Sequence, residues 1–297
     1  MRIWVVTIAA RRHRHLELQV RGLRDGDRRP DGHVVVAMGD REIESTVTRA
    51  GSDACTVFLP HDDGPLPLAA ARNLGADRAL ELGAELLVFL DVDCIPGRAL
   101  VRRYENVAGD DRYREALLCG PVTYLPPPPV GGYDLNRLPA MVDPHPARPI
   151  PDEDAVLPSR DHDLFWSLSF AVRAVTWQRL GGFCTEYTGY GGEDTDFGCT
   201  VARSGVDLAW VGGAHAFHQH HPVSDPPVEH AHDIVTNATL FHRRWGWWPM
   251  RGWLDRFAEL GVARYDSGRD RWICTVPARC ELRPQRECRP SRSVSPP

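Results

Sequence analysis

The sequence predicts an α/β protein in which helices flank a mostly parallel central sheet. Three observations lead to this fold class. Short apolar runs alternate with segments of helical periodicity along the first half of the chain, as in Ile3–Ile8 followed by His15–Leu23. The run Leu86–Leu90 (LLVFL) is apolar throughout, which is typical of a strand buried on both faces. The composition, with 42% hydrophobic and 25% charged residues, is that of an ordinary soluble globular protein.

The individual elements follow from the same patterns. The strands expected in the first half are Ile3–Ile8, His33–Ala37, Cys55–Leu59, Leu86–Leu90 and Leu117–Tyr124. The helices expected there are His15–Leu23, Leu66–Leu82 with Gly83 as its C-cap, and Arg98–Val107. The elements expected after residue 160 are a strand at Phe165–Val172, a short helix at Thr176–Leu180, a helix at Asp196–Ser204, a strand at Val206–Val211 and a helix at Val228–Arg244.

Two segments depart from this alternation. Residues 125–160 are rich in proline and show little periodicity, so we expect a flexible loop that serves as an active-site flap or an insertion. Residues 277–297 are rich in proline and arginine, which is typical of a disordered tail. We therefore expect a single domain over residues 1–276 and a tail after it.

Composition excludes several classes of function. The net charge of −5, with no sustained basic face, argues against a nucleic-acid partner. All basic residues other than histidine are arginines, which excludes a Walker-type lysine and Schiff-base chemistry. No signal peptide is predicted, because the basic run Arg11–Arg14 follows the apolar start instead of preceding it. No run approaches the ~20 apolar residues of a membrane span, so we expect a cytoplasmic protein and leave peripheral contact with a membrane open.

Asp91 and Asp93 follow the apolar strand Leu86–Leu90 directly. Ligands of open α/β sheets bind beyond the carboxyl ends of the strands, so this pair lies where a site is expected. Two carboxylates one residue apart can hold a hard divalent cation such as Mg²⁺ or Mn²⁺, or can divide a metal and a ribose between them. A cation at such a place usually neutralises a diphosphate leaving group.

A second acidic cluster lies in Gly181–Phe197 (GGFCTEYTGYGGEDTDF), where Glu193, Asp194 and Asp196 fall within four positions. Carboxylates this close repel one another, so a fold keeps them together where they meet a cation, a proton or sugar hydroxyls. An acidic turn that opens a helix would also explain them. The histidines that follow could complete a metal shell, and the sequence leaves open which of them does so: His215, His218, His220 or His221.

With these features in order, the chain resembles a nucleotide-sugar glycosyltransferase of the GT-A (Rossmann-like) fold. It is similar to family 2 enzymes and to the carboxy-terminal part of galactosyltransferases over roughly residues 1–245. Ala69–Ala76 (AAARNLGA) resembles the family's A-x-A-R-N-x-G helix, and Leu90–Asp93 (LDVD) resembles its D-x-D motif. Gly181–Phe197 resembles the stretch G-F-x-x-x-Y-x-G-W-G-G-E-D-x-D of galactosyltransferases.

The resemblance has two departures. Family 2 enzymes carry D-D-G-S after the second strand, whereas this chain has Ala37-Met38-Gly39-Asp40, so base recognition must differ. Tyr190 stands where galactosyltransferases carry a tryptophan against the sugars, which leaves the donor and acceptor sugars open.

The resemblance implies that a sugar moves from a nucleotide-diphosphate sugar, with a UDP-sugar favoured, to a hydroxyl of a glycan, a lipid or a small molecule. Inversion is expected, with Asp194 as the base and Glu193 bonded to a hydroxyl, while Asp196 caps the next helix. The implied cofactor is Mn²⁺ or Mg²⁺, with metal ligands Asp91, Asp93 and His218. The implied nucleotide-sugar contacts are Thr7, Ala9, Arg12, Asp40, Arg72, Asp91, Val92 and Asp93. The implied acceptor or sugar contacts are Trp166, Tyr187, Tyr190, Gly191 and Gly192. Residues 1–124 would form the nucleotide-binding half and residues 161–276 the acceptor- and metal-completing half.

Three alternatives stay open at this point. A retaining transferase on the same fold would need no base at Asp194. A metal-dependent nucleotidyltransferase or phosphohydrolase would use Asp91 and Asp93, but would need more carboxylates and no glycine-rich aromatic stretch. A sugar-binding module that has lost catalysis would be expected to show decay of D-x-D or G-G-E-D, and both motifs are intact.

Overall fold

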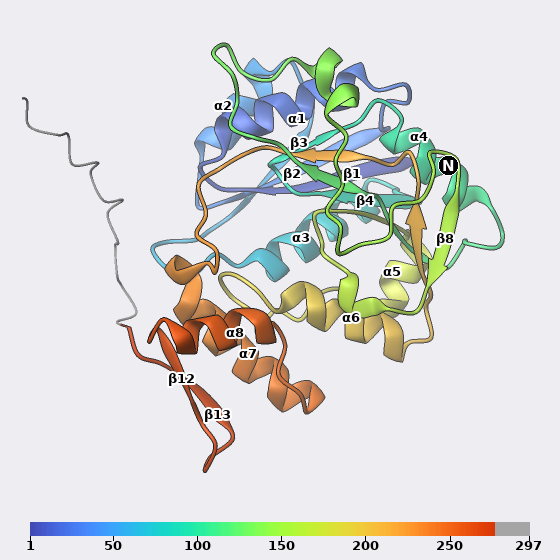
Figure 1. The fold of residues 1–297 in the computed structure, drawn as a ribbon. Helices are drawn as coiled ribbons and strands as arrows, with labels where there is room; N and C mark the ends of the chain where they lie inside the picture. The colour runs from blue at the N-terminus through green and yellow to red at the C-terminus, as the bar shows by residue number, and fades with distance from the viewer. Residues whose placement is uncertain (277–297) are drawn as a thin grey trace, which may run out of the picture.

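In the computed structural model, which describes residues 1–276, eight strands form the central sheet (Figure 1). They are β1 (Ile3–Ala9), β2 (Gly32–Met38), β3 (Cys55–Leu59), β4 (Leu86–Leu90), β6 (Leu117–Cys119), β8 (Val156–Ser159), β9 (Ser169–Arg173) and β10 (Leu208–Val211). Their order is β3-β2-β1-β4-β9-β6-β10-β8. The first four run parallel, whereas β9 and β8 run antiparallel to their neighbours. The predicted fold class is therefore confirmed.

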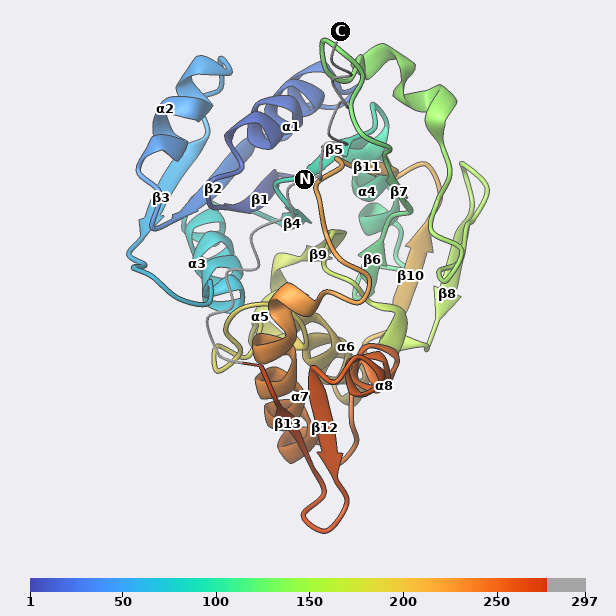
Figure 2. The same ribbon diagram turned by 60° about the vertical axis from the view of Figure 1, so that its left-hand side comes forward.

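Helices cover both faces of this sheet (Figure 2). One face carries α1 (His13–Asp25), α2 (Glu42–Arg49) and α4 (Leu100–Gly109), and the other carries α3 (Leu68–Glu81), α5 (Ala174–Leu180) and α6 (Glu193–Arg203). Strand β1 shows why: Val5 packs in the cluster that contains α4, and the next residue, Val6, packs in the cluster that contains α3. Successive side chains of a strand point to opposite faces, so a strand covered by two helical layers is apolar throughout.

A second, three-stranded sheet lies beside the first, with β11 (Ala216–His218) between β5 (Cys94–Pro96) and β7 (Val122–Tyr124). The single strand predicted over Leu117–Tyr124 is thus wrong. The strand is interrupted after Cys119, and an added Cβ at Gly120 would lie 1.9 Å from the carbonyl oxygen of Ala214. This close approach admits only glycine, and it lets β7 leave the central sheet. Because β11 pairs with β5, His218 lies opposite Cys94, the residue that follows the D-x-D motif.

The loop predicted over residues 125–160 is only partly irregular. It contains the 3₁₀ helix η1 (Leu135–Met141) and ends in β8, which pairs with β10 and so closes one edge of the sheet. The 3₁₀ helix η2 (His162–Leu164) follows it. The expectation of a structureless segment missed β8 because proline and exposed residues hide its pattern, as is common for an edge strand.

A C-terminal layer packs against α6 and lies below it in Figure 2. It consists of η3 (Val228–His230), α7 (Ala231–Trp245), α8 (Arg251–Glu259) and the hairpin of β12 (Ala263–Asp266) and β13 (Arg271–Cys274). The last three elements were not predicted. The predicted disordered tail, 277–297, lies outside the described residues. Within residues 1–276 the cysteines are free thiols, and no helix is long and apolar enough to cross a membrane.

Candidate active site

The acidic stretch lies on the first turn of α6, which begins at Glu193 and not at Asp196 as predicted. Gly191 and Gly192 precede it with φ of +88° and +93°, a conformation that suits glycine. An added Cβ at Gly192 would also lie 3.2 Å from the ring of Tyr187. Glu193 and Asp194 are therefore held at the positive end of a helix, where backbone N–H groups favour negative charge.

Arg72 joins the two acidic motifs. From α3 its Nη2 donates to Asp91 Oδ1 at 3.0 Å, and its Nη1 donates to Glu193 Oε1 at 3.2 Å. Arg72 and Glu193 are both nearly buried, so this ion pair is shielded from solvent. Arg72 Nε and Glu193 Oε2 have no hydrogen-bond partner. One buried guanidinium thus places the end of β4 against the start of α6 and leaves bonding capacity for another group.

Burial and charge shift the carboxyl groups in different directions. Burial, reinforced by the charge of Asp93, raises the pKa of Asp91 to about 6, although Arg72 opposes the shift. Burial raises the pKa of Glu193 and of Asp194, and the two charges repel each other at neighbouring positions while Arg72 opposes both shifts. The pKa of Asp93 falls to about 2, because the hydrogen bond from His221 and the charges of His218 and His221 outweigh the effect of burial.

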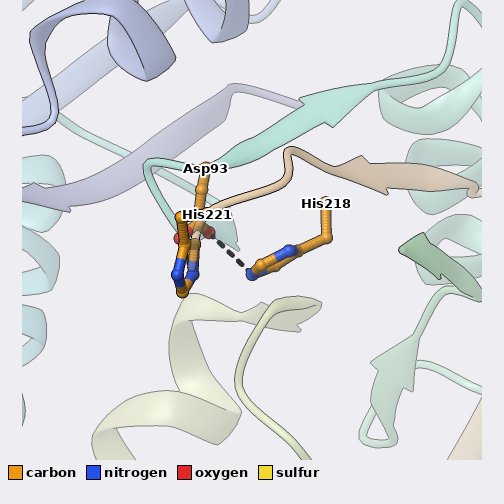
Figure 3. A group of neighbouring side chains, drawn as sticks. All are labelled: Asp93, His218 and His221. Atoms are coloured by element: carbon orange, nitrogen blue, oxygen red, sulfur yellow. Dashed lines mark ion pairs between the residues drawn. The ribbon is translucent and has the colours of Figure 1, made fainter. Parts of the chain in front are cut away.

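Asp93, His218 and His221 converge on one point (Figure 3). His218 Nε2 lies 3.4 Å from Asp93 Oδ1, and His221 Nε2 lies 3.5 Å from Asp93 Oδ2. One ligand atom from each residue lies within 4.8 Å of the others. A carboxylate and two imidazoles are donors that divalent cations use, so these residues fit a metal. Asp91, predicted as a ligand, is not part of this group; its carboxylate bonds Arg72 instead.

The other histidines of the cluster are placed elsewhere. The His215 ring lies 2.8 Å from Thr123 Oγ1, and His220 is exposed. His221 is one of the four histidines that the sequence offers as a metal ligand, but the resemblance implied His218 for that role. The position of His221 beside Asp93 depends on the turn after β11, which no local sequence pattern predicts.

On the predicted acceptor side, Tyr190 is 37% exposed. Its ring stacks on the imidazole of His230 at 4.7 Å between centroids, and Trp253 lies at 5.8 Å. Sequence reasoning did not single out His230 or Trp253. The predicted contact Tyr187 is 2% exposed and its hydroxyl donates to Asp196, so it supports the site from within. The Trp166 ring is covered on one side by the guanidinium of Arg148, 4.4 Å from its centroid.

The expectation that Asp196 caps α6 is wrong. Asp196 is 1% exposed, and its Oδ1 accepts from Tyr187 Oη at 3.1 Å, Arg244 Nε at 2.6 Å and Trp245 Nε1 at 2.6 Å. The N-cap is Gly192. Asp196 therefore ties α6 to the end of α7 and takes no part in the acidic pair.

The predicted nucleotide contacts fall into two groups. Thr7 and Ala9 have no exposed surface, and Val92 is 9% exposed. Arg12 and Asp40 are partly buried; Asp40 accepts from the backbone N–H of Arg11 and bonds the ring of His13 at 2.9 Å. The first group is thus covered by protein, whereas the second keeps some exposed surface.

Gln19, which no motif marks, supports the D-x-D turn. Its Nε2 donates to the carbonyl oxygens of Asp91 at 2.6 Å and Cys94 at 3.2 Å, and its Oε1 accepts from Thr7 Oγ1 at 2.8 Å. It is completely buried on α1. A cavity of about 470 Å³ lies between α7, β13 and the segment around Glu186, and none of the predicted site residues lines it.

Comparison with known proteins finds a matching family model and similar glucosyltransferases. Residues 158–222 match a family described as the N-terminal domain of galactosyltransferase. A validoxylamine A glucosyltransferase of Streptomyces hygroscopicus subsp. limoneus is 28% identical over 213 residues, which cover 60% of this chain and 43% of that protein. The chain thus spans less than half of this relative's length.

Solved structures show the same fold. Residues 1–349 of TarS from S. aureus, in complex with UDP-GlcNAc, align with a TM-score of 0.54 and 11% identity, over 80% of this chain and 66% of that one. The mannosyltransferase PcManGT from Pyrobaculum calidifontis, in complex with GDP-Man and Mn²⁺, aligns with a TM-score of 0.50 and 16% identity, over 82% and 64%. The resemblance to the GT-A glycosyltransferase fold is confirmed at the level of the fold and of the matched segment.

Proposed function

We propose that this chain, which has the GT-A fold of nucleotide-sugar glycosyltransferases, transfers a sugar from a nucleotide-diphosphate sugar to an acceptor hydroxyl with inversion. The observation that carries this proposal is the buried bridge of Arg72. It holds Asp91 of the D-x-D motif and Glu193 of the G-G-E-D motif in one site. Residues of two motifs that the resemblance assigns to one site are thus joined across more than a hundred positions of sequence.

Asp194 is the proposed base. It accepts the proton of the acceptor hydroxyl while that oxygen attacks the anomeric carbon of the donor. Its place on the first turn of α6 supports this role, because the helix end stabilises the carboxylate that must be present before the reaction. Glu193, with Oε2 unpaired, is proposed to bond a hydroxyl of the acceptor or the donor.

Positive charge is needed at the other end of the breaking bond. A divalent cation, Mn²⁺ or Mg²⁺, would be held by Asp93 and His218, with Asp91 beside it, and would neutralise the diphosphate as it leaves. Arg12, whose charge acts on Asp93 and His218, is proposed to contact the nucleotide. Arg72 keeps Asp91 and Glu193 in position, and Asp40, two residues after β2, is proposed to bind near the base.

The acceptor surface is proposed to include Tyr190 with Gly191 and Gly192, and an edge of Trp166. Tyr190 is the exposed aromatic ring nearest in sequence to the acidic pair, and apolar ring faces suit the C–H faces of sugars. The similarity to a validoxylamine A glucosyltransferase of Streptomyces favours a small-molecule acceptor over a glycan or a lipid. The ligands of the structural neighbours support UDP- or GDP-linked sugars as donors.

The test combines donor, metal and stereochemistry. The purified chain is incubated with UDP-glucose, UDP-galactose, UDP-GlcNAc and GDP-mannose, each with Mn²⁺ and a panel of cyclic polyol acceptors, and nucleotide release and product are measured. We expect one donor to give a product whose anomeric configuration, read by NMR, is opposite to that of the donor. A product of retained configuration would remove Asp194 as the base but would leave the transferase in place.

Nucleotide binding gives a second readout. Calorimetry with the corresponding nucleoside diphosphate should show binding in Mn²⁺ that is lost in excess EDTA. Equal affinity in EDTA would contradict the metal clamp. Absence of both transfer and nucleotide binding for every donor would contradict the proposed function as a whole.

A further inference from the structure

Helix α7 packs closely against residues 188–192, the acceptor loop, which contains Tyr190 and leads into the acidic pair. An added Cβ at Gly189 would lie 2.2 Å from Asp233 Oδ2, and one at Gly192 would lie 3.4 Å from the Cβ of Asn237. The two glycines have φ of +72° and +93°, which other residues rarely adopt. Glycine is therefore needed in this loop because α7 approaches its backbone.

Asn237 bonds the backbone of the acceptor loop at several points. Its Nδ2 donates to the carbonyl oxygens of Gly191 at 2.8 Å and Thr188 at 3.0 Å, and it lies 3.4 Å from that of Tyr190. A side-chain amide has two donor hydrogens, so the two shorter bonds use both of them. Asn237 is 2% exposed. One buried amide thus holds a loop that belongs to no helix or strand.

The start of α7 holds Tyr190 at two further points. The backbone N–H of Tyr190 donates to Asp233 Oδ2 at 3.3 Å, and its ring stacks on the imidazole of His230, the last residue of η3. Asp233 and Asn237 are four residues apart on α7, so they lie on the same face of the helix. The backbone and the ring of Tyr190 are therefore both held by residues 230–237.

The acceptor loop is continuous with the reacting groups. Helix α6 begins at Glu193, directly after Gly192. Burial, together with the charges of Asp194 and Glu193, raises the pKa of Tyr190, so its hydroxyl lies within electrostatic reach of the acidic pair. A displacement of the loop would therefore move the ring of Tyr190 relative to the proposed base.

We propose that Asn237, supported by Asp233, is a positioning residue for the acceptor, because it fixes the acceptor loop and thereby the ring of Tyr190 relative to Asp194. The inference rests on the proposed function, in which Tyr190 contacts the acceptor. No local motif marks Asn237, since its partners lie 46 to 49 residues earlier in the chain. Loss of this anchor should impair use of the acceptor more than binding of the donor.

The first measurement needs no substrate. Asn237→Leu keeps the approximate size of the side chain and removes both donor hydrogens. Hydrogen–deuterium exchange read by mass spectrometry should become faster in the peptide that covers residues 186–193, because the loop opens more easily without its anchor. The peptide that covers Leu86–Leu90 should not change. The matched control is Thr236→Ala, an exposed neighbour on α7, which should exchange like the unchanged protein.

The second measurement is steady-state kinetics with the donor and the cyclic polyol that give a product in the transfer screen. Asn237→Leu should raise the acceptor KM at least about tenfold, since misplacing a reactant by about 1 Å can cost about a hundredfold. The affinity for the donor's nucleoside diphosphate should not change. Asp233→Ala should have a smaller effect of the same kind. Asp233→Asn, which keeps an oxygen for the N–H of Tyr190, should resemble the unchanged protein.

The outcomes separate this inference from the proposed function. Unchanged exchange of residues 186–193 in a folded Asn237→Leu protein would overturn the inference, as would an equal loss of donor and acceptor affinity, which is the result expected of a residue that only packs. Sugar transfer by the unchanged protein would persist in either case. If Asn237→Leu does not fold, Asp233→Ala is tested in the same way. Faster exchange of the loop in a chain that transfers no sugar would remove the function and leave Asn237 as the anchor of the loop.

Discussion

Arg72 and Glu193 lie 121 residues apart in the sequence and form a buried ion pair, with 3.2 Å between Arg72 Nη1 and Glu193 Oε1. The same guanidinium holds Asp91. Removing it would leave the buried Glu193 and the partly buried Asp91 without their cation, and breaking a buried pair such as Arg72–Glu193 costs about 3–5 kcal/mol.

Arg72→Met should therefore lower the melting temperature by about 6–20 °C, taking about 2–4 °C per kcal/mol for a domain of this size. The measurement is thermal unfolding followed by circular dichroism. Arg78→Met is the matched control, since it removes an exposed arginine of the same helix and should change little. A combined Arg72→Met and Glu193→Gln change should regain part of the loss; no recovery would show that Arg72 acts mainly through other contacts.

Asp194→Asn should reduce sugar transfer by about 10²–10⁴-fold, the usual contribution of a general base. The amide keeps the shape of the side chain and an oxygen that can accept the backbone N–H of Thr195 at 2.8 Å. Melting temperature and nucleotide affinity should therefore stay close to those of the unchanged protein. Turnover near that of the unchanged protein would end the assignment of Asp194 as the base.

The rate should depend on pH through the acidic pair. Burial raises the pKa of both Glu193 and Asp194, so the base is partly protonated at pH values where an ordinary carboxyl is ionised. We expect kcat/KM to rise with pH on a limb that lies above the usual range of carboxyl groups. Glu193→Gln removes the neighbouring negative charge, while the positive charge of Arg72 still favours the ionised form of Asp194. The rising limb of the pH profile should therefore move to lower pH. An unmoved limb would assign it to another group.

The same shifts have a consequence for stability. A carboxyl whose pKa is higher in the folded protein than in the unfolded chain holds its proton more tightly when folded. The contribution of Glu193 and Asp194 to stability is thus present below their ordinary pKa values and is lost as the pH rises through the raised values. The difference in unfolding free energy between the unchanged protein and a Glu193→Gln variant, measured by urea titration, should accordingly grow in favour of the variant as the pH rises.

Asp196→Ala should destabilise the protein by about 2–5 kcal/mol, because Tyr187, Arg244 and Trp245 all lose a charged acceptor. Urea unfolding measures the loss. Asp196→Ala should thus lose stability, whereas Asp194→Asn should lose activity and keep its stability. A stable Asp196→Ala protein that has lost only turnover would place Asp196 in the reaction instead.

Gln19→Leu should weaken the D-x-D turn, because the carbonyl oxygens of Asp91 and Cys94 lose a buried hydrogen-bond donor. Leaving a buried acceptor without a partner lowers the free energy of unfolding by about 1–3 kcal/mol. We expect a lower melting temperature and a larger effect on the KM for the nucleotide sugar than on kcat. Gln178→Leu, at an exposed position of α5, is the control. A change in kcat alone would argue against support of the donor site by Gln19.

Much of the first half of the fold could be predicted because its signals are local. Cys55–Leu59 and Leu86–Leu90 are strands with the predicted bounds, and Gly83 follows the end of α3 with φ of +86°. Apolar runs and glycine positions are properties of neighbouring residues, so they can be read in one dimension. The break between β6 and β7 could not be predicted, because Gly120 is required by Ala214, almost a hundred residues away.

The sequence by itself determined which chemical groups this protein brings to its site: a D-x-D pair after a buried strand, a glycine-framed acidic pair and a run of histidines. Only the tertiary structure decided their partners. In the folded chain Asp91 accepts a hydrogen bond from Arg72, Asp93 lies beside two imidazoles, and Asp196 accepts a hydrogen bond from α7. The physical reason is that a motif records residue types and spacing, whereas pairing depends on which distant backbone segments lie within about 3 Å of one another once the core has packed.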